Sequence, residues 1–166
     1  IIIAAFLFCA VLLYVLMPLG QTSVSDLQTA DNGSFIELGE GNVQYEISGT
    51  GSEVIVLVSG FSVPYYCWDP VVPLLVDEGY KVIRYNHYGR GLSARISGHY
   101  TLDLYKNQLA ELITALNLNE PVHITGLSMG GLVAMMYASD NPSLVKSVSL
   151  ISPAGYYMPH SFSTKL

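Results

Sequence analysis

The sequence predicts an α/β fold, a mostly parallel sheet with helices on both of its faces. Two observations carry this prediction. Short apolar runs typical of buried strands alternate with helix-length segments through the second half of the chain. One of these runs ends in the turn Gly126-Leu127-Ser128-Met129-Gly130, which leads directly into an apolar helix-length segment. The 166 residues suffice for one domain with a core, and we expect that core at 34–155.

The first segment, 1–20, is an uncharged apolar run, and a membrane span takes about 17–25 apolar residues. We expect a transmembrane anchor helix there. The alternative is a cleaved signal peptide, with Ser23-Val24-Ser25 as a weak cleavage site. No Lys or Arg precedes Lys81, so the positive-inside rule predicts a domain on the non-cytoplasmic side, membrane-anchored or else secreted. The polar stretch 21–33 is the expected linker.

The first elements of the core are strands. Residues 35–38 and 43–47 alternate apolar and polar positions around a glycine-rich turn, which indicates a β-hairpin with one wet face. Residues 54–58 are all apolar and mostly β-branched, as in a buried central strand. A helix is expected over 69–78, with Asp69 as its N-cap, Pro70 at its first position and Gly79 ending it.

The remaining elements alternate strand and helix. Residues 81–85 form a predicted strand, and Thr101 caps a predicted helix that ends near Leu116. Residues 122–127 form the strand before the glycine–serine turn, an amphipathic helix starts near Met129, and 145–151 form a last strand. The expected buried stripe of the first of these helices consists of Leu104, Leu109, Leu112, Ile113 and Leu116.

Composition excludes some functions. The net charge of −6 and the isoelectric point near 5.0 argue against a nucleic-acid partner, since no basic cluster exists to neutralise phosphates. Cys9 lies in the apolar run and Cys67 beside Trp68, so no disulfide framework, metal site or cofactor is predicted. Cys67 has no base beside it and is a poor candidate nucleophile.

Ser128 is the candidate nucleophile. A serine on a tight strand-to-helix turn sits in strained backbone. We expect Gly126 and Gly130 to be required on either side of it, because these crowded positions lack room for a Cβ. The strain holds the hydroxyl above the sheet edge, where helix N–H groups favour developing negative charge. The alternative is a structural turn without chemistry.

With two further motifs, this turn resembles the α/β-hydrolase family. Ser59-Gly60-Phe61 follows the central strand where the family has a His-Gly turn, and residues 86–93 are similar to its D-x-x-G-x-G-x-S loop. The resemblance covers 35–155 and is to the lipase, esterase and carbon–carbon hydrolase branch, so 156–166 would begin its helical cap. Ser59 and Asn86 stand where the family has His and Asp. We interpret both as altered turn hydrogen bonding, with Asn86 forming an Asx-turn.

The resemblance implies an acyl-enzyme on Ser128 and an oxyanion hole made by the backbone N–H groups of Phe61 and Met129. The Phe61 side chain would be a wall for an acyl chain or, alternatively, ordinary core packing. The family order of serine, acid and histidine leaves only Asp140 and His160 after Ser128. Asp140 lies about 18 Å along the helix from the serine and is expected to be a surface charge at the helix end. His160 lies where the cap would begin.

We therefore expect a serine hydrolase acting on carboxylic esters, small or lipidic, whose acid and base lie beyond residue 166. The 166-residue chain alone would then be inactive. The alternative is a non-catalytic, membrane-anchored binding module of the same fold. Three histidines precede the serine and break the family order: His87, His99 and His123. His123 is expected to be a buried or edge histidine within its strand.

Overall fold

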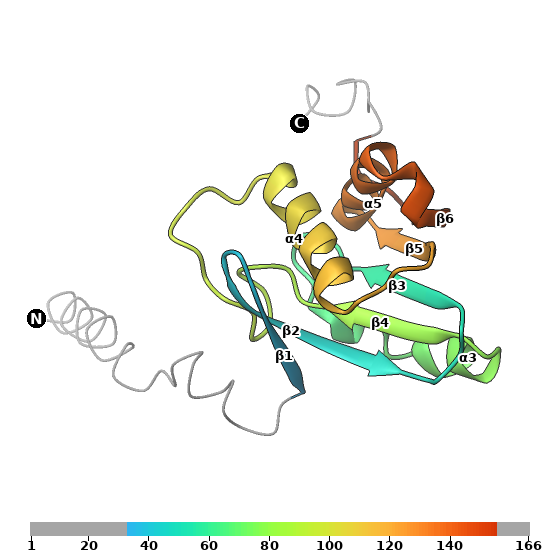
Figure 1. The fold of residues 1–166 in the computed structure, drawn as a ribbon. Helices are drawn as coiled ribbons and strands as arrows, with labels where there is room; N and C mark the ends of the chain where they lie inside the picture. The colour runs from blue at the N-terminus through green and yellow to red at the C-terminus, as the bar shows by residue number, and fades with distance from the viewer. Residues whose placement is uncertain (1–32, 156–166) are drawn as a thin grey trace, which may run out of the picture. The chain divides into compact units, whose positions relative to one another are not determined.

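The computed structural model describes residues 33–155. Six strands form one sheet in the order β1-β2-β4-β3-β5-β6 (Figure 1). The pairs β1–β2 and β2–β4 are antiparallel, and β4, β3, β5 and β6 are mutually parallel, which confirms the expected mostly parallel sheet. The strands are β1 (Ser34–Leu38), β2 (Gly41–Ser48), β3 (Val54–Val58), β4 (Lys81–Tyr85), β5 (Val122–Leu127) and β6 (Val145–Ile151).

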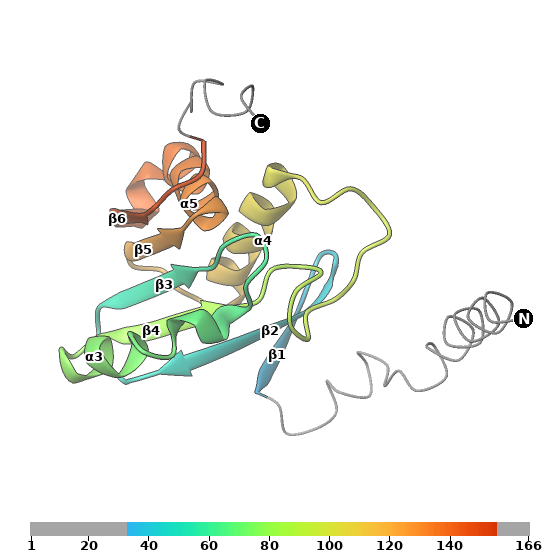
Figure 2. The same cartoon turned by 180° about the vertical axis from the view of Figure 1, so that it is seen from behind.

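Helices cover both faces of this sheet, as expected (Figures 1 and 2). The alternation of side chains along β3 decides which residues meet which helix. Val56 and Val58 belong to a core with α4 (Leu102–Ala115) and α5 (Met129–Asp140). Ile55 and Leu57 point to the opposite face and pack with Trp68 and Val72, around α3 (Val72–Asp77).

The helix α4 follows its sequence signals closely. The Thr101 side chain accepts a hydrogen bond from the Leu104 N–H at 3.2 Å, which caps the helix as predicted. Its buried face also contains Tyr105 and the polar Gln108, neither of which belongs to the predicted stripe. Of that stripe Leu109, Leu112 and Ile113 are buried, and Leu104 and Leu116 pack partly buried against the core.

The helix predicted over 69–78 is confirmed over 72–77, but its predicted start at Asp69 is wrong. The 3-10 helix η2 (Tyr65–Trp68) comes first, and α3 begins only after Val71, with no side-chain cap. The reason is electrostatic: the Asp69 carboxylate forms an ion pair with Arg84, a buried side chain of β4, instead of capping a helix. Gly79 does follow the helix, with φ +87°, a conformation that favours glycine.

The helix α5 is not amphipathic in the predicted sense. One face is buried, but the other face also carries apolar residues, and Met135 is 38% exposed. At the adjacent sheet edge of the described chain, Leu150 and Ile151 of β6 are exposed as well.

Three predicted segments lie outside the described residues, except for Gly33: the anchor at 1–20, the linker at 21–33 and the cap at 156–166. Between residues 33 and 155, no helix combines the length and the apolar character that a membrane span requires.

Candidate active site

Ser128 lies between β5 and α5 in a strained backbone conformation, with φ 53° and ψ −117°. Few residues other than glycine adopt this region, at a cost of roughly 1–3 kcal/mol. Three backbone hydrogen bonds, each 3.0 Å long, hold it there. The Ser128 N–H donates to the Ile151 carbonyl, and the Ser128 carbonyl accepts from Gly131 and Ala154. The end of β6 therefore supports the turn.

The glycines around Ser128 are sterically required, as the sequence predicts. A Cβ on Gly126 would lie 2.4 Å from the Gly130 carbonyl oxygen, and one on Gly130 would lie 2.2 Å from the Val58 carbonyl oxygen. Real Cβ contacts are essentially never shorter than 3.0 Å. The first close approach holds the start of α5 against β5, and the second holds it against the end of β3.

The turn after β3, which contains Phe61, lies beside Ser128. β3 and β5 are adjacent parallel strands, so the turn after β3 and the turn after β5 lie at the same sheet edge. A Cβ built on Gly60 would lie 3.4 Å from the Ser128 Cβ, which places the residues just before Phe61 against the serine. Met129 is the first residue of α5, and its N–H has no acceptor within the helix. Within the described chain, neither the Met129 nor the Phe61 N–H donates a backbone hydrogen bond.

The Phe61 side chain is 58% exposed, so the core-packing alternative is wrong. Its ring lies under the guanidinium of Arg90, with the Arg90 Cζ 4.6 Å from the ring centroid. An apolar side chain of the turn after β3 is therefore exposed.

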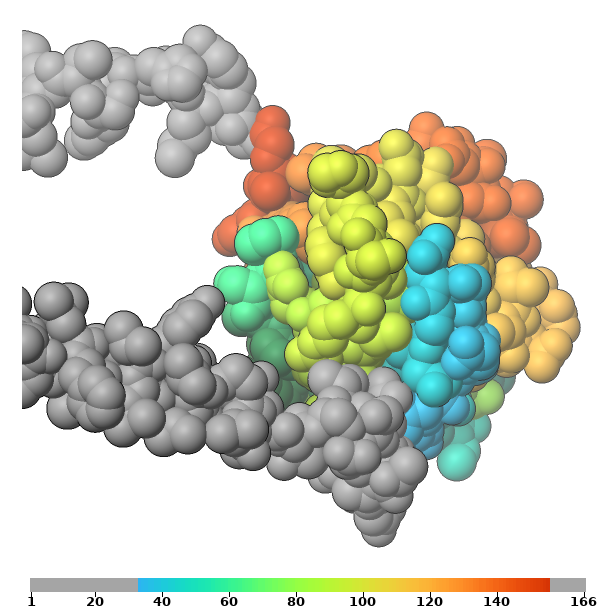
Figure 3. Space-filling view, turned by 90° about the vertical axis from the view of Figure 1, so that its left-hand side faces the viewer, coloured from blue at the N-terminus to red at the C-terminus, as the bar shows by residue number. Residues whose placement is uncertain are grey.

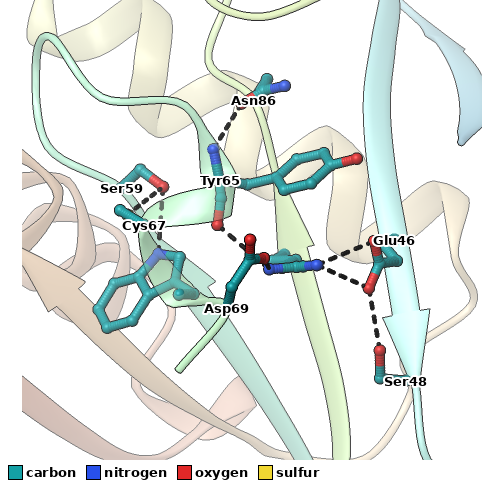
Figure 4. Close-up of polar contacts among 9 residues, drawn as sticks. Glu46, Ser48, Ser59, Tyr65, Cys67, Asp69 and Asn86 are labelled. Atoms are coloured by element: carbon teal, nitrogen blue, oxygen red, sulfur yellow. Dashed lines mark hydrogen bonds and ion pairs between the residues drawn. The ribbon is translucent and has the colours of Figure 1, made fainter. Parts of the chain in front are cut away.

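Ser59 has the structural role that the sequence suggests. It is buried, and its hydroxyl accepts a hydrogen bond from the Trp68 indole N–H at 3.1 Å and lies 3.7 Å from the Cys67 sulfur (Figure 4). Its carbonyl accepts a hydrogen bond from the His87 Nε2 at 3.0 Å. Burial raises the pKa of the Cys67 thiol, so this cysteine stays protonated and is a poor nucleophile.

The predicted Asx-turn at Asn86 is wrong. Its Oδ1 accepts a hydrogen bond from the Tyr65 N–H at 2.7 Å (Figure 4), and its Nδ2 donates to the Gln44 Oε1. The Tyr88 N–H, which an Asx-turn would use, donates instead to the Gln108 Oε1 at 3.1 Å. A buried amide from α4 thus replaces the local turn, and Asn86 joins the loop to η2.

The histidines and acids of the described chain lie elsewhere. His123 is at the start of β5, about 17 Å from the serine at 3.3 Å per residue, and contacts Ser147 Oγ at 2.7 Å and Glu53 Oε2 at 3.2 Å. His99 is exposed in the loop before α4. Asp140, the last residue of α5, forms an exposed ion pair with Lys106 at 2.6 Å, the surface charge that was expected.

His87 is fully buried, and burial lowers its pKa to about 4, so it is neutral near pH 7. Its Nε2 is occupied by the Ser59 carbonyl. His160 lies outside the described residues. Among those residues, no imidazole or carboxylate is hydrogen-bonded to Ser128, and no three His, Cys, Asp or Glu side chains are grouped to hold a metal ion.

Sequence patterns did not indicate the role of Arg84. This buried residue of β4 bonds both carboxylate oxygens of Glu46, at 2.9 and 3.0 Å, and pairs with Asp69 (Figure 4). Its guanidinium also lies 4.8 Å from the Tyr65 ring centroid. Arg84 therefore fixes η2, and with it Trp68, against the sheet. An arginine within an otherwise apolar strand was the available signal, since a buried charge requires partners.

Comparisons with known proteins agree with this geometry. The family model described as alpha/beta hydrolase fold matches residues 53–165. A Synechocystis protein provisionally named as a non-heme chloroperoxidase is 34% identical over 113 residues, 68% of this chain and 40% of the relative. Lipase 1 of Psychrobacter immobilis is 31% identical over 120 residues, 72% of this chain and 37% of the lipase.

Among solved structures, a hydrolase from Pseudomonas aeruginosa aligns with a TM-score of 0.71 and 28% identity, over 79% of this chain and 49% of that one. The chain thus spans about two fifths of the length of these two curated relatives. The match of the family model, together with the sheet order and the glycine–serine turn, shows that the chain belongs to the α/β-hydrolase fold family.

Proposed function

We propose that this protein is a serine hydrolase that cleaves carboxylic esters through an acyl-enzyme on Ser128. One observation carries the proposal. The serine occupies a strained turn at the amino end of α5, where the N–H groups of Met129 and Phe61 donate no backbone hydrogen bond within the described chain. Such a turn exposes a hydroxyl beside donors that stabilise an oxyanion.

In the proposed reaction, the Ser128 oxygen attacks the ester carbonyl carbon and loses its proton to a general base. The carbonyl oxygen becomes an oxyanion that accepts hydrogen bonds from the two N–H groups. The bond to the alcohol then breaks and the alcohol leaves with a proton, after which water hydrolyses the acyl-enzyme. Loss of one oxyanion donor typically lowers kcat by about 10²–10³.

The general base and its acid are proposed to lie beyond residue 166. None of the described histidines is hydrogen-bonded to Ser128, and the chain spans only part of its relatives' length. The 166-residue chain alone is therefore expected to have little activity, since losing triad members costs several orders of magnitude in rate. Expressing residues 1–166 beside the full-length protein tests this. Comparable turnover by both would require a base among the histidines of this chain.

The substrate is proposed to be an ester because relatives carry the names lipase and monoacylglycerol lipase. Other relatives carry the provisional names carbamate hydrolase and non-heme chloroperoxidase, so a series of p-nitrophenyl esters of increasing acyl length is the appropriate substrate panel. The apolar ring of Phe61 at the surface supports acceptance of an acyl chain.

A membrane location is part of the proposal, on the strength of the apolar segment 1–20 alone. Carbonate extraction at high pH tests it. Recovery of all of the protein in the soluble fraction would contradict an anchor, and a mature N-terminus just after Ser25 would favour the cleaved signal peptide.

The catalytic proposal is tested on the full-length protein with p-nitrophenyl butyrate. Ser128→Ala should abolish turnover while leaving the melting temperature nearly unchanged. Ser52→Ala is the matched control, because Ser52 is an exposed serine before the amino end of β3, at the opposite sheet edge. Turnover that survives Ser128→Ala would refute the assignment. A wild-type protein without turnover on any ester would favour the non-catalytic binding module.

A further inference from the structure

We propose that His87 and Arg90 are positioning residues that hold the Phe61 N–H toward Ser128. The inference rests on the proposed function and assigns a role to the loop after β4, in which both residues lie. This loop lies at the surface beside the β1–β2 hairpin (Figure 3) and is joined to it by a hydrogen bond from the Ala94 N–H to the Asn42 carbonyl.

His87 fixes one end of the turn formed by residues 59–61. Its Nε2 donates to the Ser59 carbonyl at 3.0 Å, because a carbonyl can only accept. The imidazole is buried and packs between two aromatic rings, with centroid distances of 5.2 Å to Tyr85 and 4.7 Å to Tyr105. Because the ring cannot move freely, the position of the Ser59 carbonyl is set by the core.

Arg90 fixes the other end of the turn. Its Nε donates to the Phe61 carbonyl at 2.5 Å, and its guanidinium covers the Phe61 ring. The guanidinium is held in turn, because Nη1 donates to the Gly89 carbonyl at 3.1 Å. The Arg90 N–H also donates to the His87 carbonyl at 2.9 Å, which joins the two positioning residues to each other.

These two contacts flank the peptide that carries the proposed oxyanion donor. The Phe61 N–H belongs to the peptide between Gly60 and Phe61, and the carbonyls on either side of it are those that His87 and Arg90 bind. Gly60 has no Cβ to restrict its backbone, so this peptide would otherwise rotate easily. The two side chains remove that freedom and keep the N–H on the side of Ser128.

A merely structural role would lower stability without a specific effect on the reaction. A positioning role predicts instead that kcat falls while KM changes little, because the oxyanion forms only in the transition state. We expect Arg90→Met in the full-length protein to lower kcat on p-nitrophenyl butyrate by roughly tenfold, less than the loss of a whole oxyanion donor.

Arg95→Met is the matched control. Arg95 lies in the same loop and also donates to backbone carbonyls, those of Gly91 at 2.7 Å and Ser93 at 2.8 Å. Within the described chain it donates no hydrogen bond to the turn at 59–61. Its replacement should leave kcat within about twofold. A second variant, Arg90→Ala, opens space for a soluble guanidinium ion, and millimolar guanidinium should restore part of its kcat but not affect Arg95→Ala.

The outcomes separate the two proposals. Absence of Ser128-dependent turnover in the wild type would refute the proposed function itself. Turnover in the wild type with an unchanged kcat in Arg90→Met, or an equal loss in Arg95→Met, would overturn the positioning role. If Arg90→Met does not fold, failure of guanidinium to raise the kcat of Arg90→Ala would overturn it instead. For His87, the donor-retaining variant His87→Gln should keep more of kcat than His87→Leu.

Discussion

Replacing Gly130 by alanine would place a methyl group against the backbone that leads into the turn at 59–61. The new Cβ would lie 2.2 Å from the Val58 carbonyl oxygen and 2.5 Å from the Ser59 carbonyl oxygen. Reaching even 3.0 Å requires a movement of about 0.8 Å, and both obstacles are backbone atoms that no side-chain rotation can remove. Either α5 or the end of β3 must therefore shift.

Two effects of this substitution oppose each other. Within a helix, glycine is less favourable than alanine by about 1 kcal/mol, so helix propensity alone predicts stabilisation. Overpacking of a close contact costs about 1–3 kcal/mol, and more where the backbone must move. The contact is shorter than ordinary overpacking produces, so we expect a net loss of about 2 kcal/mol in the free energy of unfolding. A shift near 1 Å at the serine should also lower ester turnover by roughly 10²-fold.

Gly98→Ala is the control for this prediction. A Cβ on Gly98 would have its nearest neighbour at 4.0 Å, and its φ lies outside the left-handed region. This variant should be as stable as the wild type or slightly more stable. Urea denaturation followed by circular dichroism measures the stabilities, and p-nitrophenyl butyrate measures turnover. A Gly130→Ala protein as stable and as active as Gly98→Ala would refute the steric account of the turn.

Three further predictions concern stability. Folding lowers the pKa of His87 from 6.5 to about 4, so the unfolded state binds more protons than the folded state between these pH values. The free energy of unfolding should therefore fall by about 2 kcal/mol from pH 7 to pH 5. Denaturation curves of His87→Gln should lack this pH-dependent component. Arg84→Met leaves the partly exposed carboxylates of Glu46 and Asp69 without their ion-pair partner and should lower the free energy of unfolding by about 2 kcal/mol. Arg84→Lys should recover only part of this loss. Equal stability of the Met and Lys variants would contradict this prediction. Thr101→Ala removes a helix cap and should lower the free energy of unfolding by about 1 kcal/mol. The control Thr114→Ala, at an exposed position of the same helix, should change it by no more than about 0.5 kcal/mol. Equal losses in the two variants would exclude capping as the cause.

The strands could be predicted from the sequence because their signals are local. Residues 54–58 are apolar and β-branched, and they form β3 with the predicted bounds, as do 81–85 for β4 and 145–151 for β6. The cap at Thr101 was also local, since the hydroxyl and its partner are three residues apart. In each case a short stretch contains all the atoms that decide the structure.

The segment before α3 could not be predicted in this way. Its start depends on Asp69, whose carboxylate pairs with Arg84 fifteen residues later in the chain rather than with nearby N–H groups. The Asx-turn failed for the same reason, since Gln108 of α4 takes the Tyr88 N–H. A local pattern contains no information about such distant partners.

Part of the candidate site could be predicted from local signals, and part of it could not. The strand–turn–helix at Ser128 and the crowding at its glycines followed from residue types and spacing. His87 and Arg90 contact residues of the turn at 59–61 that lie 28 and 29 positions earlier in the chain, and no sequence motif predicts these contacts. The role of Ser128 as the nucleophile stays a prediction.

The most direct measurement is the mass of the peptide that becomes acylated during turnover. Full-length protein mixed with p-nitrophenyl butyrate and quenched in acid within the first turnovers should carry one butyryl group. After proteolysis we expect that group on the peptide containing Ser128, and its absence in Ser128→Ala. A butyryl group on any other residue, or steady turnover without a covalent adduct, would contradict the account.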